Sequence, residues 1–166
     1  MSLHMRRSAT LFFLFLIAAC GGEQEGSGSS GEKTALLTAG TLGEQTVLPV
    51  ADYLAKEQFA NADQGNGMRQ AQICKACHSL ESGGPNMIGP ALYGMFGRGV
   101  GEHAGFDYSP VMRNATFVWT PRALDAWLAQ PGKFLPGNRM AFGGVFSQAD
   151  RDDLIAYLLV VTSGNH

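Results

Sequence analysis

The sequence Cys74-Lys75-Ala76-Cys77-His78 is the stretch around which the rest of the chain is interpreted. Two thiols separated by two residues, with an imidazole directly after the second, are the pattern of covalent c-type haem attachment. Each thiol can add to one vinyl group of the haem, and the next residue then lies under the iron. We therefore predict one covalent haem c, with thioether bonds at Cys74 and Cys77 and an axial iron ligand at His78.

A CxxC pair also occurs in zinc sites and in redox-active dithiols. A structural zinc site needs two further ligands, but the only other cysteine is Cys20, and the remaining histidines, His4, His103 and His166, are not paired. A thioredoxin-like pair lies in a strand–helix setting, and no such pattern surrounds Cys74. Haem attachment is the interpretation that remains.

Residues 62–166 predict an all-α haem domain with about four to five helices. We expect helices over Asp63 to Lys75, from Pro110, from Pro121 to about Ala129, and after Ser147. Ser109-Pro110 and Thr120-Pro121 pair a capping residue with proline, and Ser147 with Asp150 forms a capping-box-like arrangement. Residues 79–105 are rich in Gly and Pro without any helical period, which is typical of Ω-type loops. We expect the last helix to cross the first.

Five further motifs resemble those of class I cytochromes c, the family that includes the mitochondrial electron carrier. They are Gly89–Arg98 (GPALYGMFGR), Gly105–Ser109 (GFDYS), Trp119-Thr120, Pro136–Phe142 (PGNRMAF) and Ala149–Leu158 (ADRDDLIAYL). The resemblance covers roughly Asp63 to Val161 and implies the cytochrome c fold, with Ω-type loops wrapped around one haem.

The resemblance also implies roles for single residues. In the family the carbonyl of a proline accepts the N–H of the proximal imidazole, which assigns Pro90 to the orientation of His78. Met140 is implied as the second axial ligand. The haem propionates would be surrounded and hydrogen-bonded by Arg98, Tyr108 and Trp119.

Four positions depart from the family pattern. Ala71 stands where an aromatic residue is usual, and three further residues replace the usual Asn, Tyr and Thr on the Met side: Met112, Trp127 and Asn138. These substitutions leave open the hydrogen-bond network around Met140, and the reduction potential with it.

The first 20 residues have the pattern of an export signal. Arg6 and Arg7 precede the apolar run from Ala9 to Ala19, which is too short to span a bilayer. The run ends in Leu-Ile-Ala-Ala-Cys20, which resembles a bacterial lipoprotein box whose cysteine becomes the lipidated N-terminus. The alternative is an ordinary signal peptide in which Cys20 has no such role.

Residues 21–61 are expected to form a flexible tether between this signal and the haem domain. The segment from Gly21 to Lys33 is nearly all Gly, Ser, Glu and Gln, a composition that buries no core. Within the tether, the segment from Pro49 to Phe59 fits a short helix or a partly ordered stretch equally well. The sequence thus predicts a haem domain joined to its N-terminal signal by a long flexible tether.

Ligation by His and Met leaves no open iron position, and the thioether favours ferrous iron. We therefore expect a monomeric single-electron carrier, not an enzyme, on the periplasmic side of a bacterial membrane, anchored there by N-terminal lipid. The expected partners are redox proteins such as a cytochrome bc complex and a terminal oxidase or a reaction centre. From Asp63 onward, eight basic residues balance eight acidic ones, and no basic patch indicates nucleic-acid binding.

Two other functions remain open at this point. The chain can be a fixed haem subunit of an oxidase or dehydrogenase complex, with the tether serving only assembly. It can also be a peroxidase-like or gas-sensing haem protein, which requires Met140 to leave the iron readily. The replaced residues on the Met side are the feature that favours this last alternative.

Overall fold

The structure, a computed structural model, describes residues 37–163. Its seven helices are α1 (Val50–Leu54), α2 (Glu57–Ala60), α3 (Gln64–Lys75), α4 (Pro110–Asn114), α5 (Pro121–Ala129), α6 (Pro131–Phe134) and α7 (Gln148–Val161). These residues contain no β-strand, only an isolated bridge between Gly99 and Val118. The all-α prediction is confirmed, and five of the helices follow residue 62, as expected. None of the helices in this range is long and apolar enough to cross a membrane.

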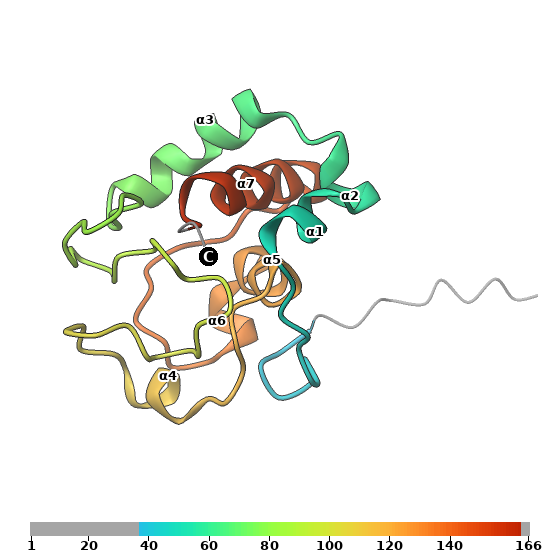
Figure 1. Ribbon diagram of the computed structural model, residues 1–166. Helices are drawn as coiled ribbons and strands as arrows, with labels where there is room; N and C mark the ends of the chain where they lie inside the picture. The colour runs from blue at the N-terminus through green and yellow to red at the C-terminus, as the bar shows by residue number, and fades with distance from the viewer. Residues whose placement is uncertain (1–36, 164–166) are drawn as a thin grey trace, which may run out of the picture. The chain divides into compact units, whose positions relative to one another are not determined.

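Helices α3 and α7 pack against each other along one side of the domain, as Figure 1 shows. A Cβ atom on Gly67 would lie 2.2 Å from the carbonyl oxygen of Asp153 and 2.7 Å from Cβ of Tyr157. Glycine is therefore required where the two backbones approach most closely. The predicted contact between the first and last haem-domain helices is confirmed, and it positions α3, the helix that carries Cys74.

The predicted helix starts lie where the capping residues indicated. The side chain of Thr120 accepts the N–H of Ala123, and that of Ser147 accepts the N–H of Asp150. Ser109 occupies the N-cap position of α4, but its hydroxyl makes no capping bond. These caps satisfy backbone groups that a helix start otherwise leaves free, so local chemistry explains where α5 and α7 begin.

Residues 79–105 form loops without helix or strand, as expected, and the irregular region continues to Ser109. Asn86 holds two parts of this region together, because its side-chain amide donates to the carbonyl of Ala104 at 3.2 Å and its oxygen accepts the N–H of Ala91 at 2.9 Å. Gly101 has a φ of 75°, and a Cβ atom there would meet the carbonyl oxygen of Met112 at 2.6 Å. Side-chain hydrogen bonds and turns therefore order this region.

Residues 37–61 differ from the expected flexible tether. The structure packs them onto the haem domain. The segment from Pro49 to Phe59, for which a short helix was one interpretation, contains α1 and all of α2 but its last residue, Ala60. The reason is apolar burial, since Leu42 is 1% exposed and Tyr53 and Phe59 are 4% exposed each. Residues 1–36, with the expected signal, Cys20 and the start of the tether, lie outside the described residues.

Candidate functional site

The CxxCH segment continues the last turn of α3. The backbone N–H groups of Cys77 and His78 both donate to the carbonyl of Cys74, at 3.1 and 2.9 Å. This turn brings the two thiols and the imidazole onto one short piece of backbone, and all three side chains are half-buried. The arrangement suits covalent attachment of a flat cofactor next to the imidazole.

The His78 ring is oriented by a single strong hydrogen bond. Its Nδ1 lies 2.7 Å from the carbonyl oxygen of Pro90. A carbonyl oxygen only accepts, so Nδ1 must carry the proton, and Nε2 is left with a free lone pair. The pairing of Pro90 with His78 that the family resemblance implied is therefore present, and it presents Nε2 as a metal ligand.

Gly89 completes the support of this imidazole. A Cβ atom on Gly89 would lie 2.2 Å from Cε1 and 2.6 Å from Nδ1 of His78, so only glycine leaves room for the ring. Burial lowers the pKa of His78, although the hydrogen bond to Pro90 acts in the opposite direction. The ring is thus held as a neutral imidazole, which is the form that binds metals.

The thiol of Cys74 does not have the properties of a redox-active cysteine. Burial raises its pKa to about 11, with a smaller contribution from Cys77 in the same direction. Reactive dithiols depend on a lowered thiol pKa. Among the described residues, moreover, no group of three or more His, Cys, Asp and Glu side chains is placed to hold a metal ion. The geometry therefore supports neither of the two alternative interpretations of the CxxC pair.

Arg98, Tyr108 and Trp119 lie in one region. The N–H of Trp119 donates to the carbonyl of Arg98 at 2.9 Å. Burial lowers the pKa of Arg98, and the nearby Tyr108 counteracts this effect. The Arg98 guanidinium donates to the carbonyls of Ala91 and Tyr93, both at 3.3 Å. Among the described residues Arg98 forms no ion pair, although the charge of Glu102 also raises its pKa. The half-buried guanidinium can therefore still bind a further anionic group.

Ser109 adds a donor that the sequence analysis missed as a site residue. The residue is 3% exposed, and its hydroxyl has no hydrogen-bond partner. A buried hydroxyl without a hydrogen-bond partner costs free energy. Ser109 directly follows Tyr108 in the chain. The cation of Arg98, the phenol of Tyr108 and this free hydroxyl fit a buried anionic group such as a haem propionate. The quoted GFDYS motif contained Ser109, but its serine was interpreted only as a helix cap.

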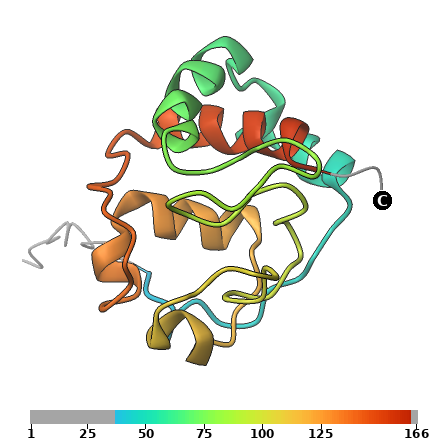
Figure 2. The same ribbon diagram turned by 90° about the vertical axis from the view of Figure 1, so that its left-hand side faces the viewer.

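Met140 lies on the segment between α6 and α7, far along the chain from His78. Its side chain is half-buried and packs against the hydrophobic core. In Figure 2 this segment runs along the left of the view, while the loops that follow α3 lie to its right. The assignment of His78 and Met140 as the two axial ligands stays a prediction.

Asn138 orders the backbone next to Met140. Its side-chain nitrogen donates to the carbonyls of Pro131 and Leu135 at 3.0 and 2.8 Å, and its side-chain oxygen accepts the N–H of Met140 at 2.9 Å. From the sequence, Asn138 was only a departure from the family pattern that left this network open. The side-chain hydrogen bonds form a network within the loop itself.

The helices, the CxxCH turn and the buried cationic region define the class to which the molecule belongs, the all-α proteins with covalently attached haem. Comparison with known proteins agrees with this class. A cytochrome c of Chlamydomonas reinhardtii is 41% identical over 109 residues, which is 63% of this chain and 97% of the relative. A cytochrome c of Euglena viridis is 45% identical over 98 residues, 59% of this chain and 94% of the relative.

A bacterial relative, a cytochrome c homolog of Bradyrhizobium diazoefficiens, is 43% identical over 93 residues, 55% of this chain and 50% of its own length. No family model matches the chain. On the extent and identity of these matches, the chain belongs to the cytochrome c family. Its cofactor is one covalently bound haem c.

Proposed function

We propose that the protein carries single electrons and that His78 and Met140 are the axial ligands of its haem iron. The observation that supports this most strongly is the 2.7 Å hydrogen bond from His78 Nδ1 to the carbonyl of Pro90, next to Cys74 and Cys77. That bond leaves Nε2 free, and a neutral imidazole nitrogen is the usual proximal ligand of haem iron.

Each of the other site residues has a role in this proposal. Cys74 and Cys77 hold the cofactor by two thioether bonds. Arg98, Tyr108, Ser109 and Trp119 surround the propionates, where the Arg98 guanidinium offsets their charge. The bound haem c supplies a one-electron iron couple. The Met140 thioether favours the ferrous state relative to a second imidazole.

Two protein ligands leave no open coordination position, which favours electron transfer over chemistry on a bound substrate. The hydrogen bonds of Asn138 hold the Met140 backbone in place, and this counts against a peroxidase-like or gas-sensing function that needs Met140 to leave readily. Rigid attachment also keeps the geometry similar in both oxidation states. The protein is therefore proposed to be an electron carrier without catalytic turnover of its own.

Optical spectra of the haem-loaded chain test the ligand set. The ferric wild type is expected to show the far-red band of sulfur bound to iron, and Met140→Ala is expected to lose it. Met112→Ala is the matched control, because Met112 is another half-buried methionine packed on the core, and it should keep the band. If the wild type lacks the band and binds cyanide or carbon monoxide quickly, the iron has an open position and the electron-carrier proposal fails.

The location and partners are proposed from the sequence pattern alone. Residues 1–20 are an export signal with a lipidated Cys20, residues 21–36 are part of a tether, and the domain lies on the periplasmic side of a bacterial membrane. A cytochrome bc complex would donate electrons, and a terminal oxidase or a reaction centre would accept them. Because charges are nearly balanced from Asp63 onward, electrostatic steering toward these partners would be weak.

Cys20→Ser tests the anchor. The wild type is expected in the membrane fraction of a bacterial host that attaches haem, extracted by detergent and not by salt. The variant is expected in the soluble periplasmic fraction with an unchanged haem spectrum. If both proteins fractionate alike, lipid on Cys20 is not the anchor.

A further inference from the structure

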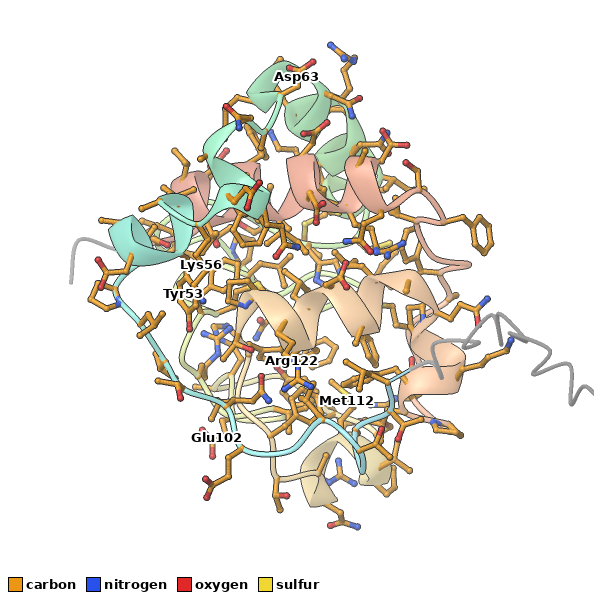
Figure 3. All side chains as sticks on the ribbon, turned by 90° about the vertical axis from the view of Figure 1, so that its right-hand side faces the viewer. Tyr53, Lys56, Asp63, Glu102, Met112 and Arg122 are labelled. Atoms are coloured by element: carbon orange, nitrogen blue, oxygen red, sulfur yellow. The ribbon has the colours of Figure 1, made fainter. Side chains whose placement is uncertain are left out.

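Residues 37–48, called the strap here, run across the domain before α1 begins. The N–H of Ala39 donates to the carbonyl of Phe134 at 2.9 Å. Leu42 is 1% exposed, and its carbonyl accepts a hydrogen bond from the Arg122 guanidinium at 3.0 Å. The hydroxyl of Thr120 donates to the side chain of Gln45 at 2.7 Å. Figure 3 shows Arg122 between α5 and the strap. The strap is thus bound to both α5 and α6.

Phe134, which the strap contacts through its backbone, belongs to an aromatic cluster in the core. Its ring packs edge-to-face on Phe117 and on Trp127, with centroid distances of 5.3 and 6.0 Å. Trp127 packs in turn on Trp119 at 5.7 Å. Edge-to-face pairs of this kind stabilise a core beyond the area they bury. Helix α6 is therefore held between the strap and this cluster.

Helix α6 is connected to Met140 by the side chain of Asn138. One side chain ties the carbonyl of Pro131, the first residue of α6, to the backbone N–H of Met140. If α6 moved away from the core, the hydrogen bonds of Asn138 would have to move with it or break. The contacts thus run from Ala39 of the strap to Phe134 of α6, and from Pro131 of the same helix through Asn138 to Met140.

We propose that the strap is a positioning element for Met140, which keeps the segment of residues 135–147 closed and the thioether on the iron. The inference rests on the proposed ligation by Met140. In this view the strap raises the free energy needed to open that segment, because opening must also disturb α6 and the hydrogen bond to Ala39. The replaced residues on the Met side do not make Met140 labile, since contacts from before the haem domain hold it.

Displacement of Met140 by cyanide in the ferric, haem-loaded chain measures how readily the segment opens. Leu42→Ala removes the buried side chain of the strap and is expected to raise the apparent cyanide affinity on the order of tenfold, a size common for coupling between two sites. The loss of the far-red sulfur–iron band follows the displacement directly. Arg122→Met removes the hydrogen bond to Leu42 while leaving the core intact, and a smaller increase is expected.

Leu159→Ala is the matched control, because Leu159 is also 0% exposed but lies about two turns beyond Arg151 on α7. It should lower the melting temperature as Leu42→Ala does and leave the cyanide affinity within about twofold. Equal cyanide affinities for Leu42→Ala and Leu159→Ala would overturn the inference, since the strap would then contribute only global stability. If Leu42→Ala does not fold, an unchanged affinity in Arg122→Met overturns it instead. A wild type without the far-red band would overturn the proposed ligation itself.

Discussion

The segments that carry His78 and Met140 are fixed in different ways. His78 directly follows the 12-residue helix α3, and its ring is held by its neighbours Gly89 and Pro90. Met140 lies in a segment without helix or strand, ordered by the bonds of Asn138 within the segment and by Arg151 of α7. The first ligand is therefore set next to a regular helix, and the second by side-chain bonds in an irregular segment.

This difference predicts which of the two ligand-carrying segments unfolds locally first. Regions held by few buried contacts and by loop hydrogen bonds have the lowest free energies of local unfolding. The described contacts of the Met140 segment are few. They include the hydrogen bonds of Asn138, the ion pair of Arg139 with Asp107, the bond from the Val145 N–H to the Leu128 carbonyl, and the bonds from Arg151 on α7. We expect the His78 side to remain intact when the Met140 segment opens.

Gly89→Ala is expected to have the largest effect of the changes considered. The new Cβ would lie 2.2 Å from the His78 ring, so the imidazole must move and lose its hydrogen bond to Pro90. Overpacking of this kind should lower the free energy of unfolding by about 3 kcal/mol. Urea unfolding of the haem-loaded chain measures this loss, and a changed optical spectrum should accompany it.

Gly143→Ala is the matched control on the Met140 side. Nothing lies within 4 Å of a Cβ atom at this position, and Gly143 is not among the glycines with positive φ. Its free energy of unfolding should stay within about 0.5 kcal/mol of the wild type. Equal losses from the two changes would contradict the view that the His78 side is the tightly packed one.

Arg151→Met is expected to have an intermediate effect, and on the Met140 side. The Arg151 guanidinium is bound to Asp125 at 2.7 Å and to the carbonyls of Val145 and Phe146 at 2.8 and 3.1 Å. Its loss should cost about 2 kcal/mol, because charged hydrogen bonds are removed from a largely buried site. Backbone amides of residues 140–147 should then exchange with solvent faster, while those of residues 79–92 keep their rates.

Arg69→Met serves as the reference for this change. The side chain of Arg69 is 66% exposed, and its ion pair with Asp63 spans 3.9 Å. An exposed pair of this length contributes little, so stability and amide exchange should not change measurably. Faster exchange throughout the Arg151→Met chain would mean that Arg151 supports the whole fold and not the Met140 segment.

The helices and the His78 side could be predicted from the sequence because their determinants are local. Thr120-Pro121 and Ser147 mark helix starts by chemistry confined to one turn, and the structure has helices where these residues indicate. The pairing of His78 with Pro90 spans only 12 positions and lies within a motif. Pattern and structure agree where the contacts are short in sequence.

The strap and the Met140 network were not predictable in the same way. Arg122 meets Leu42 across 80 positions, and Thr120 meets Gln45 across 75. The tether was predicted from the composition of Gly21 to Lys33 and was extended over the residues of the strap. Asn138 was noted as a replacement of the residue usual in the family, but the hydrogen bonds that its side chain makes depend on where α6 ends. Long-range packing decides the position of the strap, whereas the bonds of Asn138 are short in sequence but form only when α6 ends at Phe134. A single sequence displays neither.

The smallest expected effect concerns the first turn of α3, on the His78 side. The Asp63 carboxylate accepts the N–H groups of Gly65 and Asn66 at 2.8 and 3.0 Å. The bond from Asn66, together with that from Gly65 and the charge of Arg69, holds the pKa of this carboxyl below its usual value. Because the folded pKa is lowered, the carboxylate stabilises the fold above the unfolded pKa of about 3.9, and this contribution is lost as the pH falls through the folded value.

Asp63→Asn separates the charge from the cap, because asparagine keeps an oxygen that accepts the same backbone N–H groups. Thermal unfolding at pH 7 should show the variant slightly less stable than the wild type, and the difference should close below about pH 4. Asp63→Ala removes both the charge and the acceptor, so a difference from the wild type should persist at low pH. A gap between Asp63→Asn and the wild type that stays constant down to low pH would mean that the charge is not its source. Because Asp63 lies at the start of α3, the far-red band assigned to Met140 should be the same in all three proteins. An unchanged band would show that a change on the His78 side leaves the Met140 side unaffected.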